Sequence, residues 1–446
     1  MAEVVPFKAL RFTEKAGRPS DLCCPPYDII SEEQRRAYLA ENEHNIIRLE
    51  LPRDGEDPYR TASDVLKKWL DDGVLATDAD DSFYIYGEEF TINGVTRSFK
   101  GIIGRVKLED FSKGVILPHE NTLSKAKDDR LNLMKATNCN FSEIYSLYFD
   151  DEHTTADVIA SITDNTAPSA EFTDAEGVTH RLWICTDRDT LNMITEQFKE
   201  RKLYIADGHH RYETGLNYRN YRRADGKSNG NMCDGTSASV TVSATECDSA
   251  MHGYDYIMMM LVNIRDEGLV VLPTHRIVRD LENFDFDDLK NKAASDFIVD
   301  EMTDRNEMNE RLDAAYNNGA KAFGCITDKG IYLFTLKKKP DEVEELSETA
   351  PSLRQLDVTV LHSLILEKYL GIDKENMAAQ INLTYTRDID EGENAVKSGA
   401  DACFILNPTR ITEIAEVAAA GEKMPQKSTY FYPKLITGLV MNKLDD

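Results

Sequence analysis

The sequence is poor in positive charge and has no long apolar run. Lys and Arg total 52 against 79 Asp and Glu among 446 residues, which gives a formal net charge of −27. Nucleic acids and anionic membranes are bound through clusters of Lys and Arg, so we expect neither partner. A phosphate-bearing ligand would have to be bound by a local group of donors instead of by the field of the whole protein.

Signals for export, membrane insertion and disulfide bonding are also missing. The first residues lack the basic start and apolar core of a secretory signal. The most apolar stretch, residues 257–262, is far shorter than the roughly 20 residues of a membrane helix. The eight cysteines are scattered and form no C-x-x-C pair, which argues against a zinc ribbon or a thioredoxin-type site. We therefore predict a cytoplasmic protein.

The common nucleotide and hydrolase motifs do not occur. The sequence has no G-x-G-x-x-G, G-x-S-x-G or H-E-x-x-H, so a Rossmann domain, an esterase and a zincin have no support. The stretch from Gly421 to Ser428 has a superficial likeness to a P-loop. Gln426 stands where the second glycine is required, and a helical pattern precedes the stretch, so we reject the P-loop interpretation.

Helix and strand patterns alternate along the chain and predict an α+β protein. A capping box of Ser31 and Gln34 should open one helix, and a second should run from Pro58 to Gly73. We expect a strand at residues 83–86, then a hairpin that turns at Asn93-Gly94, then a strand at residues 101–108. The predicted regions are 1–115, 116–280 and 281–446, and the polar residues 337–351 should form a surface loop.

The sharpest local feature is Asp207-Gly208-His209-His210-Arg211, which follows an apolar strand and opens a helix. The first amides of a helix are unpaired donors at the positive end of its dipole. Arg211 and the imidazoles add charge-assisted donors, which suits the phosphate of a nucleotide or phospho-amino acid. Asp207 could also hold Mg²⁺ or fix a histidine tautomer. The alternative is that Asp207 caps the helix and the histidines satisfy buried partners.

A second polar stretch begins at Pro118-His119-Glu120 and continues through Lys125, Lys127 and Arg130. Glu120 is eligible to take a proton from a substrate hydroxyl. The three basic residues are unusual in so acidic a chain and could contact phosphates. The alternative is an N-capped helix with a solvated face.

Three weaker stretches could contribute contacts to a substrate. Pro25 and Pro26 can fix an extended segment that presents Tyr27 and Asp28. A predicted strand ends in polar and basic residues at 274–276, and lysines stand among aromatic residues near the C-terminus. The alternatives are a turn, a strand end without function and an aromatic docking tail. The candidate residues are Tyr27, Asp28, His275, Arg276, Lys427 and Ser428.

The D-G-H-H-R element resembles the signature of the ParB/sulfiredoxin-like superfamily, and most closely that of its free-serine kinases. In those kinases a proline-histidine-glutamate segment precedes this motif, and its counterpart here is Pro118-His119-Glu120. The resemblance implies a nucleotide-binding α+β core in residues 116–280. It also implies that Glu120 is the base toward the serine hydroxyl, and that four residues handle phosphates and metal: Asp207, His209, His210 and Arg211.

More broadly, the whole chain looks like a large bacterial and archaeal family of uncharacterised proteins that contain this module. The resemblance is carried by five stretches: C-P-P-Y-D at 24–28, H-E-N-T-L at 119–123, D-G-H-H-R-Y-E-T at 207–214, L-P-T-H-R at 272–276, and M-P-Q-K-S-T-Y-F-Y-P-K at 424–434.

We predict a phosphotransferase that acts on free serine or O-phosphoserine with ATP or ADP and Mg²⁺, because positioning and charge neutralisation suffice for phosphoryl transfer. A non-catalytic nucleotide-binding switch and a metal-dependent phosphatase stay open as alternatives. The predicted catalytic residues are Glu120, Asp207, His209 and His210, with Asp207 as metal ligand. The predicted phosphate-binding residues are Gly208, His210, Arg211, Lys127 and Arg130.

Overall fold

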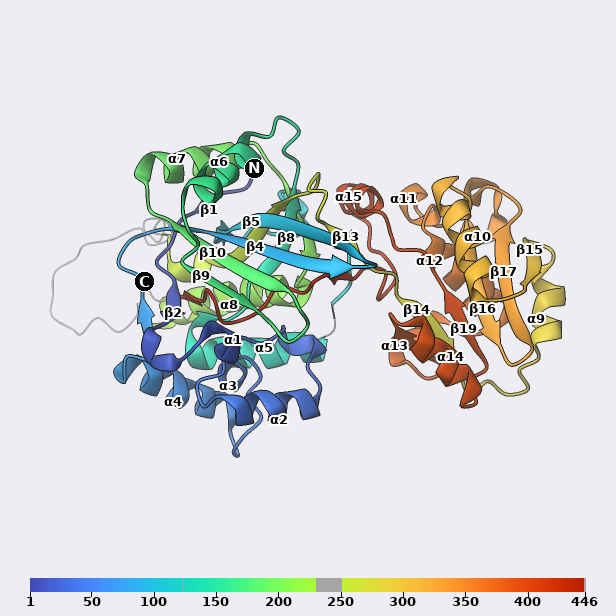
Figure 1. The fold of residues 1–446 in the computed structure, drawn as a ribbon, viewed down its shortest axis with the longest axis horizontal. Helices are drawn as coiled ribbons and strands as arrows, with labels where there is room; N and C mark the ends of the chain where they lie inside the picture. The colour runs from blue at the N-terminus through green and yellow to red at the C-terminus, as the bar shows by residue number, and fades with distance from the viewer. Residues whose placement is uncertain (123, 230–250, 445–446) are drawn as a thin grey trace. The chain divides into compact units, whose positions relative to one another are not determined.

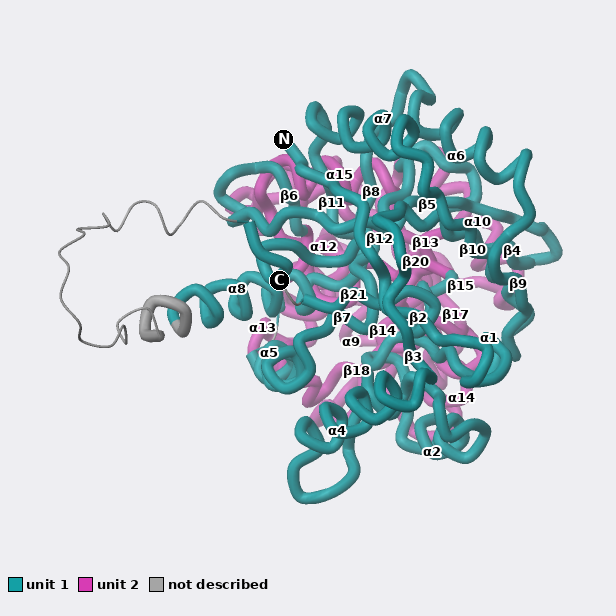
Figure 2. Tube along the Cα trace, turned by 90° about the vertical axis from the view of Figure 1, so that its left-hand side faces the viewer, with its two compact units in different colours: residues 1–118, 122–269, 433–446 teal, residues 119–121, 270–432 magenta. Residues whose placement is uncertain are grey.

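A computed structural model describes residues 1–122, 124–229 and 251–444, and it confirms the predicted α+β class (Figure 1). The chain forms two compact units (Figure 2). Unit 1 holds residues 1–118, 122–269 and 433–446, and unit 2 holds residues 119–121 and 270–432. The chain therefore returns to unit 1 at its C-terminal end. None of the described helices is both long and apolar enough to cross a membrane.

Unit 1 is built on a nine-stranded sheet. Its strand order is β6-β11-β8-β12-β5-β4-β10-β9, and β1 pairs with β5. The strands are β1 (Val4–Val5), β4 (Phe83–Ile92), β5 (Val95–Lys107), β6 (Ile116–Leu117), β8 (Ile144–Tyr148), β9 (Ala170–Thr173), β10 (Thr179–Cys185), β11 (Leu203–Asp207) and β12 (Tyr256–Asn263).

The hairpin of β4 and β5 is longer than the sequence predicted. It turns at Asn93-Gly94, as expected, with Ile92 opposite Val95. Residues 83–86 and 101–107 lie in strands, as predicted, but each segment is part of one of these two long strands and not a separate strand. Glu88 is buried inside β4. Gly101 lies inside β5, where a larger residue would not fit, because a Cβ there would lie 2.7 Å from the Leu261 carbonyl oxygen of the neighbouring strand.

Helices lie on both sides of the sheet of unit 1, with α6 and α7 on one side and α1 to α5 on the other (Figure 1). The Ser31–Gln34 capping box opens α2, and the helix predicted from Pro58 is α4. Both predictions are confirmed. The helices are α1 (Pro19–Leu22), α2 (Glu32–Glu41), α3 (Ile47–Glu50), α4 (Pro58–Asp71), α5 (Ser124–Thr137), α6 (Thr154–Asn165), α7 (Arg188–Phe198) and α8 (His209–Asn229).

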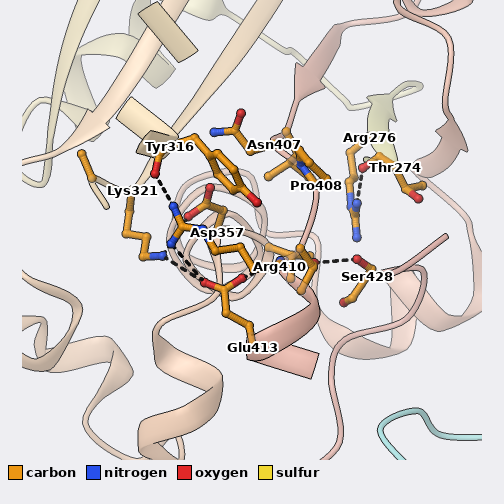
Figure 3. A pocket seen from close by; sticks show the side chains of 14 residues that line it. Thr274, Arg276, Tyr316, Lys321, Asp357, Asn407, Pro408, Arg410, Glu413 and Ser428 are labelled. Carbon is orange, nitrogen blue, oxygen red and sulfur yellow. Dashed lines mark hydrogen bonds and ion pairs between the residues drawn. The ribbon is translucent and has the colours of Figure 1, made fainter. Parts of the chain in front are cut away.

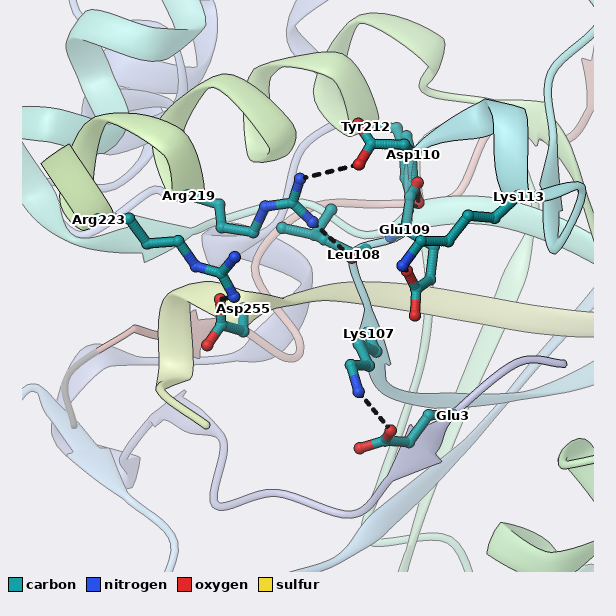
Figure 4. Close-up of polar contacts among 10 residues, drawn as sticks. All are labelled: Glu3, Lys107, Leu108, Glu109, Asp110, Lys113, Tyr212, Arg219, Arg223 and Asp255. Atoms are coloured by element: carbon teal, nitrogen blue, oxygen red, sulfur yellow. Dashed lines mark hydrogen bonds and ion pairs between the residues drawn. The ribbon is translucent and has the colours of Figure 1, made fainter. Parts of the chain in front are cut away.

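Polar contacts fasten α8 to the segment that follows β5 (Figure 4). The Tyr212 hydroxyl donates to the Glu109 carbonyl oxygen at 2.7 Å and accepts from the Glu109 amide at 3.0 Å. About two turns further along α8, the Arg219 guanidinium donates to the Leu108 carbonyl oxygen at 2.7 Å. Arg223 forms an ion pair of 2.7 Å with the buried Asp255. These contacts fix the axis of α8 and hence the place of its N-terminus.

Unit 2 contains a six-stranded antiparallel sheet in the order β15-β17-β16-β19-β14-β18. The strands are β14 (His275–Val278), β15 (Phe297–Met302), β16 (Ala322–Thr327), β17 (Gly330–Leu336), β18 (Leu383–Thr386) and β19 (Ala402–Ile405). The helices are α9 (Phe286–Ala293), α10 (Arg305–Asn317), α11 (Pro351–Arg354), α12 (Asp357–Val360), the π-helix Leu361–Tyr369, α13 (Lys374–Ala379), α14 (Ile389–Lys397) and α15 (Ile411–Ala419).

One local prediction for unit 2 needs correction. His275 and Arg276 do not lie at the end of strand β13 (Val270–Val271) but begin β14, where both are buried. The stretch 337–351 is largely exposed and irregular, as predicted, and it contains two short 3₁₀ turns. Val343 and Leu346 of this stretch pack into the core of unit 2.

Three short two-stranded ladders complete the fold. They pair β2 (Leu10–Phe12) with β3 (Leu75–Thr77), β7 (Cys139–Asn140) with β21 (Asn442–Lys443), and β13 (Val270–Val271) with β20 (Phe431–Tyr432). The ladder of β7 and β21 matters for the site below, because it anchors the C-terminal segment to unit 1.

Candidate functional site

The predicted strand, turn and helix around Asp207 are confirmed. Strand β11 ends at Asp207, α8 begins at His209, and Gly208 between them has a φ of +93°. Glycine adopts this backbone conformation without the strain that a side chain would cause. A Cβ on Gly208 would also lie 3.0–3.1 Å from atoms of the Arg211 guanidinium. Arg211 therefore lies against the turn at the positive end of the helix dipole.

The Asp207 carboxylate is held between two cations. Its Oδ1 accepts from Lys434 Nζ at 2.9 Å, and its Oδ2 accepts from Arg211 Nη2 at 3.0 Å. Burial by itself would raise the pKa of Asp207, but the charges of Lys434, Arg211 and His209 outweigh it and hold this pKa well below its usual range. Asp207 is therefore an ionised carboxylate that positions an ammonium and a guanidinium beside the start of α8.

Two buried glutamates lie next to this arrangement. Arg211 also donates to the Glu143 carbonyl oxygen, and burial raises the pKa of the Glu143 carboxyl to about 7 against the opposing charge of Arg211. Burial raises the pKa of Glu50 as well, while Arg130, Arg211 and a 2.9 Å hydrogen bond from Ser142 oppose this. In the interior of unit 1 the positive charges of the arginines thus partly offset the cost of burying these two carboxyl groups.

Arg130 and Tyr27 belong to the same neighbourhood. Arg130 of α5 donates to the Glu50 carbonyl oxygen at 2.6 Å, and its guanidinium carbon lies 4.1 Å from the centre of the Tyr27 ring. The charge of Asp28 contributes to raising the pKa of Arg211, although burial lowers it. The structure therefore brings together the C-P-P-Y-D segment, α5 and the D-G-H-H-R motif. We call Glu50, Arg130, Glu143, Asp207, Arg211 and Lys434 the charge cluster; the first three are buried and the last three are half-buried.

The remaining candidates around α8 have partners of their own. Lys127 Nζ lies 2.7 Å from Glu213 Oε2, which also accepts from the Thr122 hydroxyl at 2.8 Å. Lys127 is therefore tied to the outer part of the first turns of α8. His209 is buried and His210 is half-buried, both in the first turn of the helix. Their roles in phosphate handling stay predictions.

We expect the Glu143→Gln variant to gain stability over the wild type as the pH rises. The pKa of Glu143 is raised in the folded protein, so the unfolded chain loses its proton first and stability falls as the pH rises from about 4.5 to 7. Glutamine carries no such cost. The melting temperature of the variant relative to wild type should be a few degrees more favourable at pH 8 than at pH 5. The exposed Glu41→Gln variant should show no such trend, and a pH-independent difference for Glu143→Gln would contradict the assignment.

The predicted base Glu120 belongs to unit 2, whereas the D-G-H-H-R motif belongs to unit 1. Its backbone is tied to the 423–429 segment. Lys423 Nζ donates to the Glu120 carbonyl oxygen at 2.8 Å, and the Met424 amide donates to the His119 carbonyl oxygen at 2.8 Å. His119 Nε2 lies 3.2 Å from the Thr429 hydroxyl. The H-E-N and M-P-Q-K-S-T segments therefore form one local structure, and the role of Glu120 as base stays a prediction.

Arg276 lies among backbone carbonyl groups in unit 2 (Figure 3). The Arg276 guanidinium donates to the carbonyl oxygens of Gln426 and Lys427 at 3.3 and 3.2 Å, and also to that of Thr274. Burial lowers the pKa of Arg276 to about 10 and that of His275 to about 4.

Ser428 completes this region of unit 2, because its hydroxyl donates to the Pro425 carbonyl oxygen at 2.6 Å. The structure thus joins His275 and Arg276 with Lys427 and Ser428 in unit 2. It places the other two weak candidates, Tyr27 and Asp28, in unit 1.

The described residues do not fit the predicted Mg²⁺ site at Asp207. Both oxygens of this carboxylate already accept from cations, Lys434 and Arg211. Among residues 1–122, 124–229 and 251–444, no group of three or more His, Cys, Asp or Glu side chains is arranged to hold a metal ion. A divalent cation prefers unpaired carboxylate oxygens, so no step below is assigned to a metal on Asp207.

Sequence reasoning missed three members of the charge cluster: Glu50, Glu143 and Lys434. Glu50 and Glu143 each stand alone among apolar neighbours, which is a signal for a buried acid that needs a partner. Lys434 lies at the end of the M-P-Q-K-S-T-Y-F-Y-P-K stretch, in which Lys427 and Ser428 were the predicted candidates. Its role depends on a contact 227 positions along the chain, which no local pattern reveals.

The model of a family described as "Protein of unknown function (DUF1015)" matches residues 4–359, so the chain belongs to this family. No curated protein matches the chain.

Several solved structures are similar to the chain at low identity. A conserved hypothetical protein from Pyrococcus furiosus is 13% identical, with a TM-score of 0.33, over 74% of this chain and 90% of that one. A free serine kinase in complex with AMP is 12% identical, with a TM-score of 0.35, over 77% and 91%. SbnI from Staphylococcus aureus, truncated at its C-terminus, is 10% identical, with a TM-score of 0.35, over 76% and 86%. TM-scores below 0.5 do not establish a common fold, so the ParB/sulfiredoxin-like resemblance stays a prediction.

Proposed function

We propose that this chain is a nucleotide-dependent phosphotransferase that acts on free serine or O-phosphoserine, with the phosphates of ATP or ADP bound at the N-terminus of α8. One observation carries the proposal. Asp207 holds Lys434 and Arg211 beside a glycine turn that leads directly into a long helix. In a chain of net charge −27, this gathers cations at the positive end of a helix dipole, which is the surrounding that a phosphate requires.

The arrangement suits phosphoryl transfer because that reaction depends mainly on positioning and on stabilisation of charge. Arg211 and Lys434 are held in place by Asp207 before any ligand arrives, so little side-chain entropy is lost on binding. An ammonium has three N–H donors and a guanidinium five, and the first amides of α8 add more. His210 in the first turn supplies a further donor to the same phosphates.

The remaining roles follow the sequence motifs. We assign Glu120 to accept the proton of the serine hydroxyl in the forward reaction and to return it when phosphoserine is the donor. Arg130 and Lys127 are assigned to the electrostatic surroundings of the phosphates, through Glu50 and Glu213 respectively. Arg276, which is buried and bonded to backbone carbonyls, is assigned to hold the 426–427 segment in place.

A direct assay tests the proposal. The full chain is incubated with ATP or ADP, Mg²⁺ and free serine, and separately with phosphoserine and AMP or ADP, and the products are identified by mass. Formation of phosphoserine or of serine supports the proposal. Nucleotide binding without either product would support the nucleotide-binding switch. Absence of nucleotide binding would overturn the assignment of the α8 site.

We expect Arg211→Ala and His210→Ala to weaken nucleotide binding. Each loss of a charge-assisted contact should cost about 1.5–3 kcal/mol, which corresponds to a roughly 10- to 150-fold rise in Kd. Calorimetric titration of the full chain with ATP and ADP measures this. Arg223→Ala is the matched control, because it removes the same charge from the same helix but its side chain pairs with Asp255. Unchanged affinity in both test variants would leave the motif with a structural role only.

A further inference from the structure

Strands β4 and β10, which are neighbours in the sheet of unit 1 (Figure 1), carry buried polar side chains that none of the roles above uses. His180 of β10 lies opposite Glu88 of β4 in the strand register, and Tyr86 lies two residues before Glu88. Side chains two residues apart on a strand share a face, and so do those of directly opposite residues. Each of the three residues is only 1% exposed. The strand register therefore places three polar groups side by side in the interior of unit 1.

The Tyr86 hydroxyl joins the other two groups. It lies 2.7 Å from Glu88 Oε1 and 2.7 Å from His180 Nδ1. His180 Nε2 in turn lies 3.0 Å from Oδ2 of Asp174, the residue that directly follows β9. We call Tyr86, Glu88, His180 and Asp174 the Tyr86 network. It extends from the interior of unit 1 to a carboxylate that is 27% exposed.

The outer end of the Tyr86 network places a proton on one nitrogen of His180. Burial by itself would raise the pKa of Asp174, but hydrogen bonds from His180 and from two backbone amides hold this pKa below its usual range. The two amides, those of Glu176 and Val178, each donate to Asp174 Oδ1 at 2.9 Å. An ionised carboxylate only accepts hydrogen bonds. His180 Nε2 is therefore the donor in its contact with Asp174.

A count of protons at the Tyr86 hydroxyl indicates that the network holds one more. The hydroxyl has a single proton, yet Glu88 Oε1 and His180 Nδ1 are both acceptors when they carry none. One of the two contacts of 2.7 Å would then join two lone pairs. A proton on Glu88 lets its carboxyl donate to Tyr86 and lets Tyr86 donate to His180, whereas a proton on Nδ1 reverses both hydrogen bonds. In either position, one additional proton satisfies both contacts.

The surroundings of Glu88 favour retention of this proton. Burial raises the pKa of Glu88 to about 8, although the hydrogen bond with Tyr86 opposes this. Apart from His180, the titratable side chains that act on Glu88 or on Tyr86 are those of Asp174, Glu143, Tyr145 and Cys23. All four are acids, so none of them compensates a charge on Glu88. Glu88 Oε2 also has no hydrogen-bond partner in the described part of the chain, which a neutral carboxyl tolerates better than a carboxylate does.

We propose that the Tyr86 network is a pH-sensitive tie between β4 and the β9–β10 hairpin, closed while it holds one buried proton and weakened when that proton is lost. The proton leaves Glu88 or His180 Nδ1 for a base in the solvent, and no bond between heavy atoms changes. A buried carboxylate and an imidazole nitrogen then compete for the one proton of Tyr86. This device is independent of the phosphotransfer proposed above.

Hydrogen exchange of the full chain, measured by mass spectrometry from pH 6 to 9, tests the proposal. An open hairpin holds the proton less tightly than a closed one. Protection of the β10 amides, relative to those of β17 in unit 2, should therefore fall by up to about tenfold per pH unit until the pH reaches the pKa of Glu88, about 8, and then level off. Constant relative protection in the wild type would overturn the proposal.

Glu88→Gln is the variant that should abolish this pH dependence. Glutamine has the shape of the protonated carboxyl, and its amide can donate to Tyr86 at every pH. Glu89→Gln is the matched control, because Glu89 is the next residue of β4 but is half-buried and pairs with Arg181. It should show the fall seen in the wild type. An equal fall in Glu88→Gln would show that the network does not cause it.

Infrared difference spectra and NMR locate the proton itself. A protonated carboxyl has a carbonyl stretching band separate from those of carboxylates and amides, and Glu88→Gln should lack part of this band at pH 7. In the wild type, the Glu88 band and the NMR signal of His180 Nδ1 should change over the same pH range. Tyr86→Phe removes the hydroxyl that links them, so the two should then titrate separately. A proton on Nδ1 in place of Glu88 supports the same tie, whereas a proton on neither group at pH 7 would overturn it.

Discussion

The Glu120→Gln variant is expected to lose roughly 10²- to 10⁴-fold in turnover of serine with little change in nucleotide affinity. Glutamine keeps the shape of the side chain, but it cannot take the proton of the serine hydroxyl. The backbone ties of this segment, from Lys423 to Glu120 and from Met424 to His119, do not involve the carboxylate. Glutamine also keeps the volume and hydrogen-bonding capacity of the side chain, so we expect little change in the fold of unit 2.

Turnover and melting temperature must be measured on the same preparations. A structural role for Glu120 would lower the melting temperature and leave the turnover of each folded molecule near that of the wild type. Glu422→Gln, next to Lys423, is the matched control and should retain full turnover. Equal turnover in Glu120→Gln and Glu422→Gln would exclude Glu120 as the base while leaving the nucleotide site at α8 intact.

The Asp207→Asn variant is expected to show the largest loss of stability. It leaves the ammonium of Lys434 and the guanidinium of Arg211 without the carboxylate that now pairs with both at 2.9 and 3.0 Å. Removal of one partner from a fully buried ion pair costs about 3–5 kcal/mol, and because the Asp207 side chain is 23% exposed we expect a loss of about 2–3 kcal/mol. Denaturant unfolding of the full chain should show this loss in the transition of unit 1. Asp21→Asn is the matched control, because Asp21 is as exposed as Asp207 but its partner Arg18 is exposed, and it should cost about 1 kcal/mol or less.

The pH dependence of the Asp207→Asn effect has a definite sign. The pKa of Asp207 is lowered in the folded protein, so its contribution is complete above the unfolded pKa of about 3.9 and is lost as the pH falls further. The difference between wild type and variant should therefore be constant from pH 5 to 8 and shrink below about pH 4. The double variant Asp207→Asn/Lys434→Met should recover part of the loss, because it removes one of the stranded cations. A double variant no more stable than Asp207→Asn would show that Lys434 does not depend on Asp207.

Local sequence determined much of the secondary structure and the core of the candidate site. The Ser31–Gln34 capping box, the helix from Pro58 and the hairpin turn at Asn93-Gly94 depend on contacts within a few residues. The turn from β11 into α8 is of the same kind, because Gly208 alone permits the required backbone conformation. Such features can be inferred from the sequence because their physical causes lie next to one another along the chain.

Only the tertiary structure decided which of these residues meet. Lys434 reaches Asp207 because the C-terminal segment returns to unit 1 and pairs with Cys139–Asn140. Glu120 groups with residues 423–429 of unit 2 through hydrogen bonds to the backbone carbonyl groups of residues 119 and 120, which carry no sequence signal. Arg276 reads locally as a basic residue at the end of a strand, yet burial in β14 makes it a support for distant carbonyl groups. The sequence by itself therefore determined the turn that presents Asp207 and Arg211, whereas long-range packing determined their partners. Hydrogen bonds and ion pairs form wherever polar groups are brought within reach in the interior, whatever their separation along the chain.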